Sequence, residues 1–318
     1  MGAGLFGYTV RRLLWAIPVL FAVSLFVFFL LRLAPKDPVD ALIVKGPNTE
    51  EQAKALRKRY GYDQPIVRQY FTYMENLLKG DPGVSVKHPD FALTDIVFKK
   101  IWISSQLNFF ALLIVFSIGI PVGIYAALAR GTFMDPLTIG SWLMLDAIPT
   151  FVMAPLVQWI LILKLDLVGL TWDGVYSPNA ILPILIISLP GVAGVARLMR
   201  ASVIGVLGED YVRTARAKGL KNSTVVFVHI TRNALLPMVT VIGLSLPGII
   251  GGSLFVERAF GIPGIGQEAL QAAITPDYDV IMAITLFGSV LFVLANVFID
   301  VLYGFIDPRV RVGATRGR

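Results

Sequence analysis

The 318-residue sequence has no cysteine, and its only histidines are His88 and His229. The absence of cysteine excludes a disulfide framework, a thiol nucleophile and a thiolate metal site. No HExxH, GxSxG or paired-carboxylate membrane motif occurs, so the residue groups on which an intramembrane enzyme would depend are missing. We interpret His229 as a surface or packing histidine, and we expect no catalytic residue and no metal site.

A phosphate-binding G-x-x-x-x-G-K-[ST] motif is also absent. The chain therefore lacks the backbone nest and the lysine with which such a loop holds nucleotide phosphates. We expect no cofactor in this chain and no hydrolysis of ATP by it. If the protein does work, the energy must come from another subunit or from an ion gradient.

Charged residues are scarce, at 15% against about 25% in ordinary soluble domains, while 56% of the residues are hydrophobic and the mean hydropathy is +0.72. This composition is typical of an integral membrane protein. The net charge of +7 then reflects membrane topology rather than binding to nucleic acid.

Six windows have about 20 mostly apolar residues, the length that crosses roughly 30 Å of hydrocarbon as a helix. Their apolar runs are continuous and lack the alternation of barrel strands, so we expect an all-α integral membrane fold with six transmembrane helices. The windows are Leu13–Leu31, Leu107–Leu128, Leu137–Leu163, Ala180–Val195, Leu235–Val256 and Val280–Ile299. We interpret the first as a retained helix, because its apolar run exceeds that of a signal peptide.

Lys and Arg in the short connections predict the orientation, since positive charge favours the cytoplasmic side. With the N-terminus inside, the two short outer loops hold only Lys164 and Arg258. The cytoplasmic side then holds Arg11, Arg12, Arg130, Arg197, Arg200, Arg213, Arg216, Lys218, Lys221, Arg232, Arg309, Arg311, Arg316 and Arg318. We therefore expect both termini to be cytoplasmic.

The predicted spans divide the chain into four parts. These are an N-terminal segment with the first helix at 1–34, an extracytoplasmic helical segment at 35–100, a core of five spans at 101–308 with a cytoplasmic loop at 201–232, and a cytoplasmic tail at 309–318.

Within the extracytoplasmic segment, capping and charge patterns predict two short helices, one from Asn48 to Gly61 and one from Pro65 to near Gly80. This segment either caps the ends of the spans or forms a docking surface for a partner.

A polar stretch, EDYVRTARAKG from Glu209 to Gly219, lies between two long apolar blocks. Glu209 and Asp210 suit the start of a helix, Arg216 and Lys218 suit its end, and Gly219 supplies the left-handed residue that stops it. We predict a short helix outside the bilayer.

Small side chains at Thr214, Ala215 and Ala217 would let another protein approach the backbone of this helix closely. Alternatively, a basic amphipathic helix can rest on anionic lipid headgroups. The stretch has few of the large apolar side chains that such a helix would bury, which favours a protein partner.

The stretch EDYVRTARAKGL followed by RNALLP resembles the cytoplasmic coupling loop of permease subunits in the peptide and nickel branch of bacterial ABC importers. The likeness covers nearly the whole chain. Its other matches are Pro35-Lys36-Asp37-Pro38 to PGDP, Asp63-Gln64-Pro65 to DQP, Gln69-Tyr70 and Gly80-Asp81 with Gly83 and Ser85 to the outer segment, Phe260–Gly266 to FxxPGxG, and Asp307-Pro308-Arg309 to DPR. Lys36 replaces the family's usual glycine, and Pro82 interrupts its usual GDLG.

The resemblance implies the type I ABC importer permease fold in the bacterial inner membrane. It also implies the partners of such a subunit: a homologous second permease, two cytoplasmic ATPases that bind ATP and Mg, and an extracytoplasmic solute-binding protein. The implied cargo is a di- or oligopeptide or similar small solute, with a nickel chelate or a glutathione-like solute as alternatives.

By the same resemblance, one set of residues would contact an ATPase and a second set would form an outer gate. The ATPase-contact residues would be Glu209, Asp210, Tyr211, Arg213, Thr214, Ala215, Ala217, Lys218 and Gly219. The gate loop would comprise Phe260, Gly261, Pro263, Gly264 and Gly266, although an ordinary connector can have the same composition.

A few polar residues inside the spans are candidates for the translocation pathway. Asp146 is expected near mid-bilayer, where an ionised carboxylate costs roughly 3 kcal/mol on insertion scales. It either lines the passage, favouring cationic or amine-bearing cargo, or makes a buried structural hydrogen bond. Gln158, Ser245 and Asn296 are weaker candidates, because interhelical hydrogen bonds explain such side chains equally well.

An ion-coupled secondary transporter is the competing class of protein. Gly and Pro interrupt several predicted spans, as at Pro149 and Pro247, and such breaks can expose backbone for ion coordination. The sequence shows no convincing inverted repeat and few intramembrane charges for a proton relay. These features favour the importer subunit.

Overall fold

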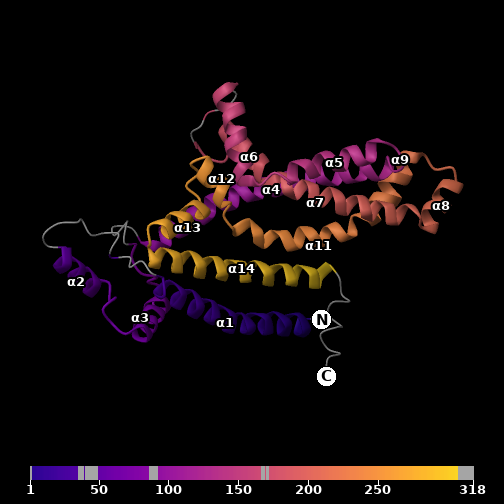
Figure 1. Ribbon diagram of the computed structural model, residues 1–318. Helices are drawn as coiled ribbons and strands as arrows, with labels where there is room; N and C mark the ends of the chain where they lie inside the picture. Colours follow the sequence, from indigo (N-terminus) through magenta and orange to yellow (C-terminus); the bar gives the residue numbers. More distant parts are fainter. Residues whose placement is uncertain are drawn as a thin grey trace. The chain divides into compact units, whose positions relative to one another are not determined.

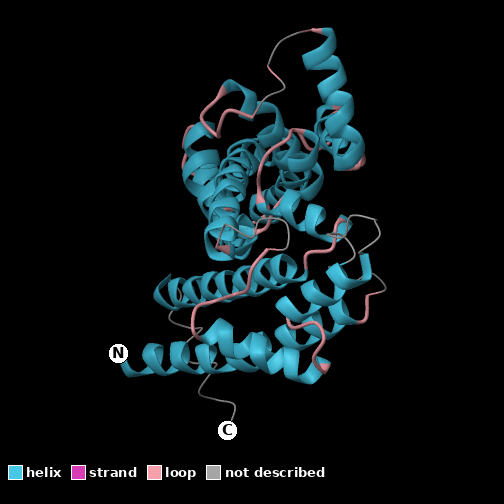
Figure 2. Ribbon diagram, turned by 90° about the vertical axis from the view of Figure 1, so that its left-hand side faces the viewer, coloured by secondary structure: helices cyan, strands magenta, loops and turns pink. Residues whose placement is uncertain are grey.

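The computed structural model describes residues 2–34, 39, 49–85, 92–165, 169 and 172–306. These residues are largely helical, and among them the one strand-like pairing is an isolated bridge between Val84 and Ala92 (Figure 1, Figure 2). The longer helices are α1 (Gly2–Arg32), α2 (Thr49–Arg59), α3 (Ile66–Leu78), α4 (Leu93–Leu128), α5 (Met134–Asp146), α6 (Thr150–Val157), α7 (Ile181–Leu207), α8 (Asp210–Ala217), α11 (Leu236–Ser245), α12 (Leu254–Ala259), α13 (Ile265–Ile274) and α14 (Tyr278–Ile306).

Shorter helical segments join them. They are the π-helical η2 (Gln158–Lys164) and η4 (Val225–Thr231), the 3₁₀ segments η3 (Pro178–Ala180) and η5 (Leu246–Ile250), and single turns α9 (Asn222–Thr224) and α10 (Arg232–Ala234). The chain divides into two compact units. The first contains α1 to α3, the start of α4, α13 and α14, and the second contains α4 from Ser105, α5 to α11 and most of α12.

Two apolar clusters hold the first unit together. α1 and α14 run side by side (Figure 1), and Phe28 of α1 packs with Met282 and Leu286 of α14 and with Tyr70 of α3. A second cluster joins α4, α13 and α14 through Leu93, Val97, Ile101, Ile265, Ala272, Val280 and Ala283. The long apolar helices thus bury only part of their surface against each other, and much of the rest is exposed.

Arg32 ends α1 inside a cage of aromatic rings. Its guanidinium carbon lies 4.9 Å from the ring centroid of Phe28, 4.5 Å from that of Tyr62 and 5.2 Å from that of Tyr278. Each such cation–π contact contributes about 0.5–2 kcal/mol, depending on how dry the site is. Burial raises the pKa of the Tyr62 phenol, so this ring stays protonated and neutral beside the cation.

Glycines let α4 and α7 pack closely in the second unit. A Cβ at Gly123 of α4 would lie 2.5 Å from the carbonyl oxygen of Ala196 and 2.7 Å from Cβ of Met199. At Gly191 of α7, a Cβ would lie 2.6 Å from Cγ2 of Val115. Only glycine permits these approaches, because the facing atoms include backbone and tightly packed side chains.

A bidentate ion pair joins α7 to the first turn of α5. The Nε and Nη2 atoms of Arg200 each donate to a carboxylate oxygen of Asp135 at 2.6 Å. The two parallel hydrogen bonds fix the orientation of both side chains, which a single contact would not do. The sequence analysis placed Arg200 in a cytoplasmic connection, whereas α7 continues to Leu207.

Within the described ranges, four helices are long and apolar enough to cross a membrane: Thr9–Arg32, Leu93–Leu128, Pro178–Leu207 and Tyr278–Ile299. Two bent helix pairs supply two more spans if each pair is counted as one. The six-span prediction agrees with this count.

The third span, predicted from Leu137 to Leu163 with an interruption at Pro149, is sharply bent. Residues Met134–Asp146 and Thr150–Ile162 form two helices bent by 91°. The cause is Pro149, which has no backbone N–H and takes an extended ψ of 138°, so the first helix cannot continue through it. Asp146 is consequently the last residue of α5, at the bend, and not within a continuous helix.

The fifth span is also displaced from its predicted window, Leu235–Val256. It comprises Asn222–Ala234 and Leu236–Ile250, bent by 47° next to Pro237. The helical run stops before Gly252, and Val256 belongs to the separate α12. The helical run inside the predicted window therefore ends at Ile250, short of Val256.

The short helices predicted in the extracytoplasmic segment are present as α2 and α3. Several other motifs fall outside the described residues: the PKDP sequence at 35–38, His88, the DPR sequence at 307–309 and the tail at 309–318.

The close contact at Gly123 gives a testable prediction. Gly123→Ala should destabilise the protein by about 1–3 kcal/mol, because the added methyl group overpacks the interface between α4 and α7. Gly205→Ala is a matched control, since no atom lies within 4 Å of a Cβ there and alanine favours a helix. Thermal unfolding in detergent measures both, and equal midpoints for the two variants would contradict the packing argument.

Candidate functional site

Helix α8 has the boundaries that its sequence predicts. Glu209 is its N-cap residue, with φ −70° and ψ 147°, and Asp210 lies in the first turn. Arg216 lies in the last turn, and Gly219 has φ +73°, a conformation that glycine adopts without strain. The acid at the start and the base at the end complement the helix dipole.

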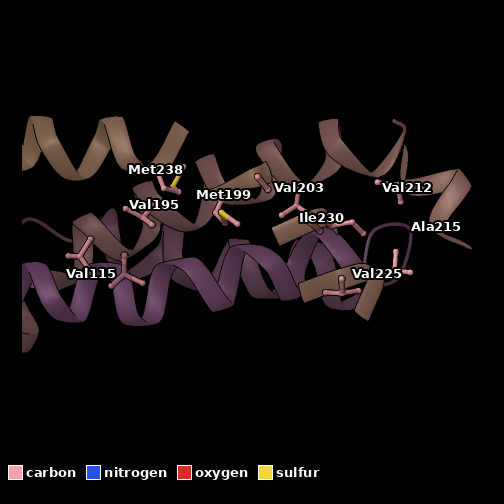
Figure 3. Close-up of a cluster of buried hydrophobic side chains, with 13 residues drawn as sticks. Val115, Val195, Met199, Val203, Val212, Ala215, Val225, Ile230 and Met238 are labelled. Atoms are coloured by element: carbon pink, nitrogen blue, oxygen red, sulfur yellow. The ribbon is translucent and has the colours of Figure 1, made fainter. Parts of the chain in front are cut away.

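One face of α8 is buried in the chain's own core. Val212 and Ala215, three residues apart, have 0% and 5% of their surface exposed. They belong to a continuous apolar cluster with Val203 of α7 and with Val225 and Ile230 of η4 (Figure 3). The sequence analysis included Ala215 in the surface offered to an ATPase, but its side chain is covered by this chain.

The opposite face of α8 is exposed and polar. Its exposed residues are Glu209, Asp210, Tyr211, Arg213, Thr214, Arg216, Ala217, Lys218 and Gly219. Arg213 and Asp210 form an ion pair at 3.6 Å with highly exposed side chains, so this pair adds little stability and leaves both charges accessible to a partner. Eight of the nine predicted contact residues therefore share one accessible surface.

The core cluster runs from α8 along α7 and α4. Met199 and Val195 of α7, Met238 of α11 and Val115 of α4 continue it away from α8 (Figure 3). The hydroxyl of Ser202 also donates to the carbonyl oxygen of Ala234 at 2.8 Å, which ties α7 to α10. Densely packed interiors transmit displacement, so α8 is mechanically connected to the long helix α7.

Each of the four predicted pathway residues has its own local environment. Gln158 donates to the carbonyl oxygen of Ala259 at 2.7 Å, joining η2 to the end of α12. Ser245 and Asn296 donate to backbone carbonyls four residues earlier, at 2.7 Å and 2.8 Å. Three of the candidates thus make structural hydrogen bonds, while Asp146 lies partly buried at the bend after α5.

The first half of the predicted gate loop, in the second unit, is a tight and well-packed turn. Phe260 and Ile262 are buried, with 5% and 0% of their surface exposed. Gly261 between them has φ +61°, which favours glycine. The Ile262 N–H donates to the carbonyl oxygen of Glu257 at 2.9 Å, closing the turn.

The second half of the loop, in the first unit, leads into α13. Gly264 is extended, with φ −90° and ψ 179°, and the N–H of Ile265 donates to the hydroxyl of Ser104 at 2.8 Å. A Cβ on Gly252 would collide with the backbone of Gly266. Sequence reasoning missed the role of Gly252, although the Gly251-Gly252 pair signals a close backbone approach.

Among the residues that the structure describes, no group of three or more His, Asp and Glu side chains could hold a metal ion. The Asp135–Arg200 pair was also missed by the sequence analysis, because its members are 65 residues apart and no local pattern links them.

Comparison with known proteins places both parts of the chain in one family. Residues 119–312 match the family described as the binding-protein-dependent transport system inner membrane component. Residues 5–100 match the N-terminal region of binding-protein-dependent transport system membrane components.

Relatives that match over almost their full length are also permeases of such transport systems. The oligopeptide transport system permease protein OppB of Salmonella typhimurium is 37% identical over 305 residues, covering 96% of this chain and 99% of the relative. OppB of Haemophilus influenzae is 36% identical, covering 95% and 98%. The permease AppB of Bacillus subtilis is 33% identical, covering 95% and 98%.

The fold has a solved counterpart in the MetNI methionine ABC transporter in an inward-facing conformation. A chain of that structure matches with a TM-score of 0.51 at 19% identity, covering 70% of this chain and 98% of the other. At this identity the match speaks for the fold alone, the type I importer permease fold. The chain belongs to the family of binding-protein-dependent transport system inner membrane components, and it is a multi-pass permease subunit of an ABC importer and not an enzyme.

Proposed function

We propose that this chain forms one half of the pathway of an ATP-driven importer of di- or oligopeptides, with α8 docked on a separate ATPase. The other half is a homologous permease, and two ATPases bind the ATP and Mg. A solute-binding protein delivers the cargo on the outer side. Both termini and α8 face the cytoplasm in this arrangement, as the excess of Lys and Arg in those segments indicates.

The exposed face of α8 carries this proposal. A short helix with an accessible polar surface and a fully buried apolar face suits a mechanical contact between two proteins. The acidic start and basic end of α8 offer both signs of charge to a partner. Complementary charges of this kind fix the register of an interface more than they add to its affinity.

Force applied to α8 would reach the membrane through the apolar cluster. Val212 and Ala215 cannot shift without displacing Val203 and Val225, because all four are fully or almost fully buried. Closure of the ATPases would therefore move α8 and α7 together. The close glycine contacts between α7 and α4 would carry this movement on to α4, and so toward the passage.

Oligopeptides are the proposed cargo because the full-length relatives carry that description in their names. Nickel chelates and glutathione-like solutes remain the alternatives within the same kind of importer. Asp146, at the bend of the third span, would be the residue that meets cationic or amine-bearing cargo. The loop from Phe260 to Gly266 would gate the outer mouth.

Charge reversal on α8 tests the docking surface. Arg213→Glu should weaken association with the ATPase by about tenfold, or ~1.4 kcal/mol, since it places an acid beside Asp210 on the exposed face. Lys54→Glu on α2 is the matched control, because it makes the same charge change on an exposed residue of the extracytoplasmic segment. Co-purification of the tagged importer measures both, and loss of ATPase in the control alone would overturn the assignment.

Neutralising Asp146 tests its contact with cargo. Asp146→Asn should lower uptake of lysine-containing tripeptides about fivefold relative to neutral tripeptides, which corresponds to ~1 kcal/mol of charge interaction in a water-filled passage. Uptake by vesicles that contain the complete importer and internal ATP provides the measurement. Unchanged rates and unchanged cargo preference would show that Asp146 has only a structural role.

Bulk at Gly264 tests the outer gate. Gly264 is buried, but its backbone is extended, so Gly264→Val brings no backbone strain and the chain should stay folded at an overpacking cost of about 1–3 kcal/mol. Transport should nevertheless fall severalfold, because a β-branched side chain stiffens the loop. Normal transport by this variant would identify the loop as an ordinary connector.

A further inference from the structure

Helix α3 presents three different surfaces around its axis. Tyr70, Tyr73, Met74 and Leu77 form the packed face, which lies in the apolar cluster with α1 and α14. The charged and polar side chains Arg68, Thr72, Glu75, Asn76 and Lys79 form an exposed polar arc. Between these two surfaces lies a row of large apolar side chains, which we call the α3 stripe: Val67, Phe71 and Leu78.

The α3 stripe has no cover within the residues that the structure describes. Val67, Phe71 and Leu78 are 58%, 66% and 84% exposed. Their spacing of four and seven residues places them on one side of the helix. Scattered apolar side chains are common on protein surfaces, but an aligned row beside a packed apolar face marks a surface that is not in water.

The packed face shows at what depth α3 lies. The hydroxyl of Tyr70 is 2.9 Å from the hydroxyl of Ser24, and the Tyr70 ring lies 6.4 Å from Phe21 and 5.2 Å from Phe28. All three partners lie inside the apolar span Thr9–Arg32. Ser24 precedes Arg32, the last residue of that span, by eight residues, or about 12 Å along the helix axis.

This depth reaches the hydrocarbon of the membrane. The apolar core of a bilayer is about 30 Å thick, so a point about 12 Å inside the end of α1 lies well within one leaflet. The stripe also adjoins exposed apolar residues of α1, because Tyr70 touches both Phe21, which is 54% exposed, and Phe71 of the stripe. The lipid-facing surface of α1 therefore continues onto α3.

We propose that α3 lies in the interface of the membrane leaflet at the C-terminal end of α1, with the α3 stripe among lipid acyl chains. The polar arc faces water, and the long side chains of Arg68 and Lys79 reach the headgroups. The occupant of the stripe is lipid and not a protein partner. The inference does not depend on the docking of α8 or on the nature of the cargo.

Such an insertion would anchor the extracytoplasmic segment to the membrane. Because α3 is both packed on α1 and inserted in lipid, it holds the end of α1, including the caged Arg32, at a fixed height. The helix α2 and the turn at Tyr62 follow this position, since Tyr62 stacks on the same arginine.

The absence of cysteine makes a direct test simple. Phe71→Cys and Asn76→Cys each introduce a single cysteine into the native full chain. A nitroxide spin label is attached to it in the complete importer, which is reconstituted in phosphatidylethanolamine–phosphatidylglycerol vesicles. Oxygen dissolves in acyl chains and a neutral nickel chelate dissolves in water. The ratio of their collision rates should be at least severalfold higher at position 71 than at position 76, which lies on the polar arc about 140° around the helix from Phe71.

Two outcomes would overturn the inference. Equal ratios at both positions, with free access of the nickel chelate, would place the stripe in water. An immobilised label at position 71 that neither reagent reaches would place it against another protein. Leu78→Cys gives a second reading of the stripe at the other end of α3, so a local disturbance at position 71 would not decide the result.

Discussion

The burial of Val212 and Ala215 is the contact on which the functional interpretation depends. These two residues fix which face of α8 is turned inward, and the remaining residues of the helix are exposed as a consequence. A helix of eight residues has little stability of its own, so its position comes from this apolar contact and not from helix propensity. The same contact connects the exposed surface of α8 to α7, which is long and apolar enough to span a membrane.

Close helix packing extends that connection to other helices of the second unit. The glycines of α4 and α7 bring two backbones together, and the Arg200–Asp135 pair adds a directed polar contact between α7 and α5. Membrane helices associate through such small residues and hydrogen bonds, because lipid supplies no hydrophobic drive between apolar surfaces. Two other spans of this unit are bent, one next to Pro149 and the other next to Pro237. Neither of them is a single straight helix.

The sequence predicted those features that depend on local patterns. Apolar runs of sufficient length predicted the spans, and the caps at Glu209 and Gly219 predicted α8 almost to the residue. It failed where the outcome depends on residues far apart in the chain. Pro149 predicted an interruption of the apolar run from Leu137 to Leu163, but the angle of 91° between the two helices depends on their packing and could not be predicted. The burial of Ala215 was missed because small residues suit both a partner interface and an internal contact.

Solvent accessibility of α8 in the assembled importer tests the central claim most directly. Ala217→Cys places a thiol on the exposed face, and Ala215→Cys places one on the buried face, in a chain with no other cysteine. A membrane-impermeant maleimide should label position 217 rapidly in the isolated chain and at least tenfold more slowly once the ATPases are bound. Position 215 should stay unlabelled in both states. Equal labelling of position 217 with and without the ATPases would contradict the account.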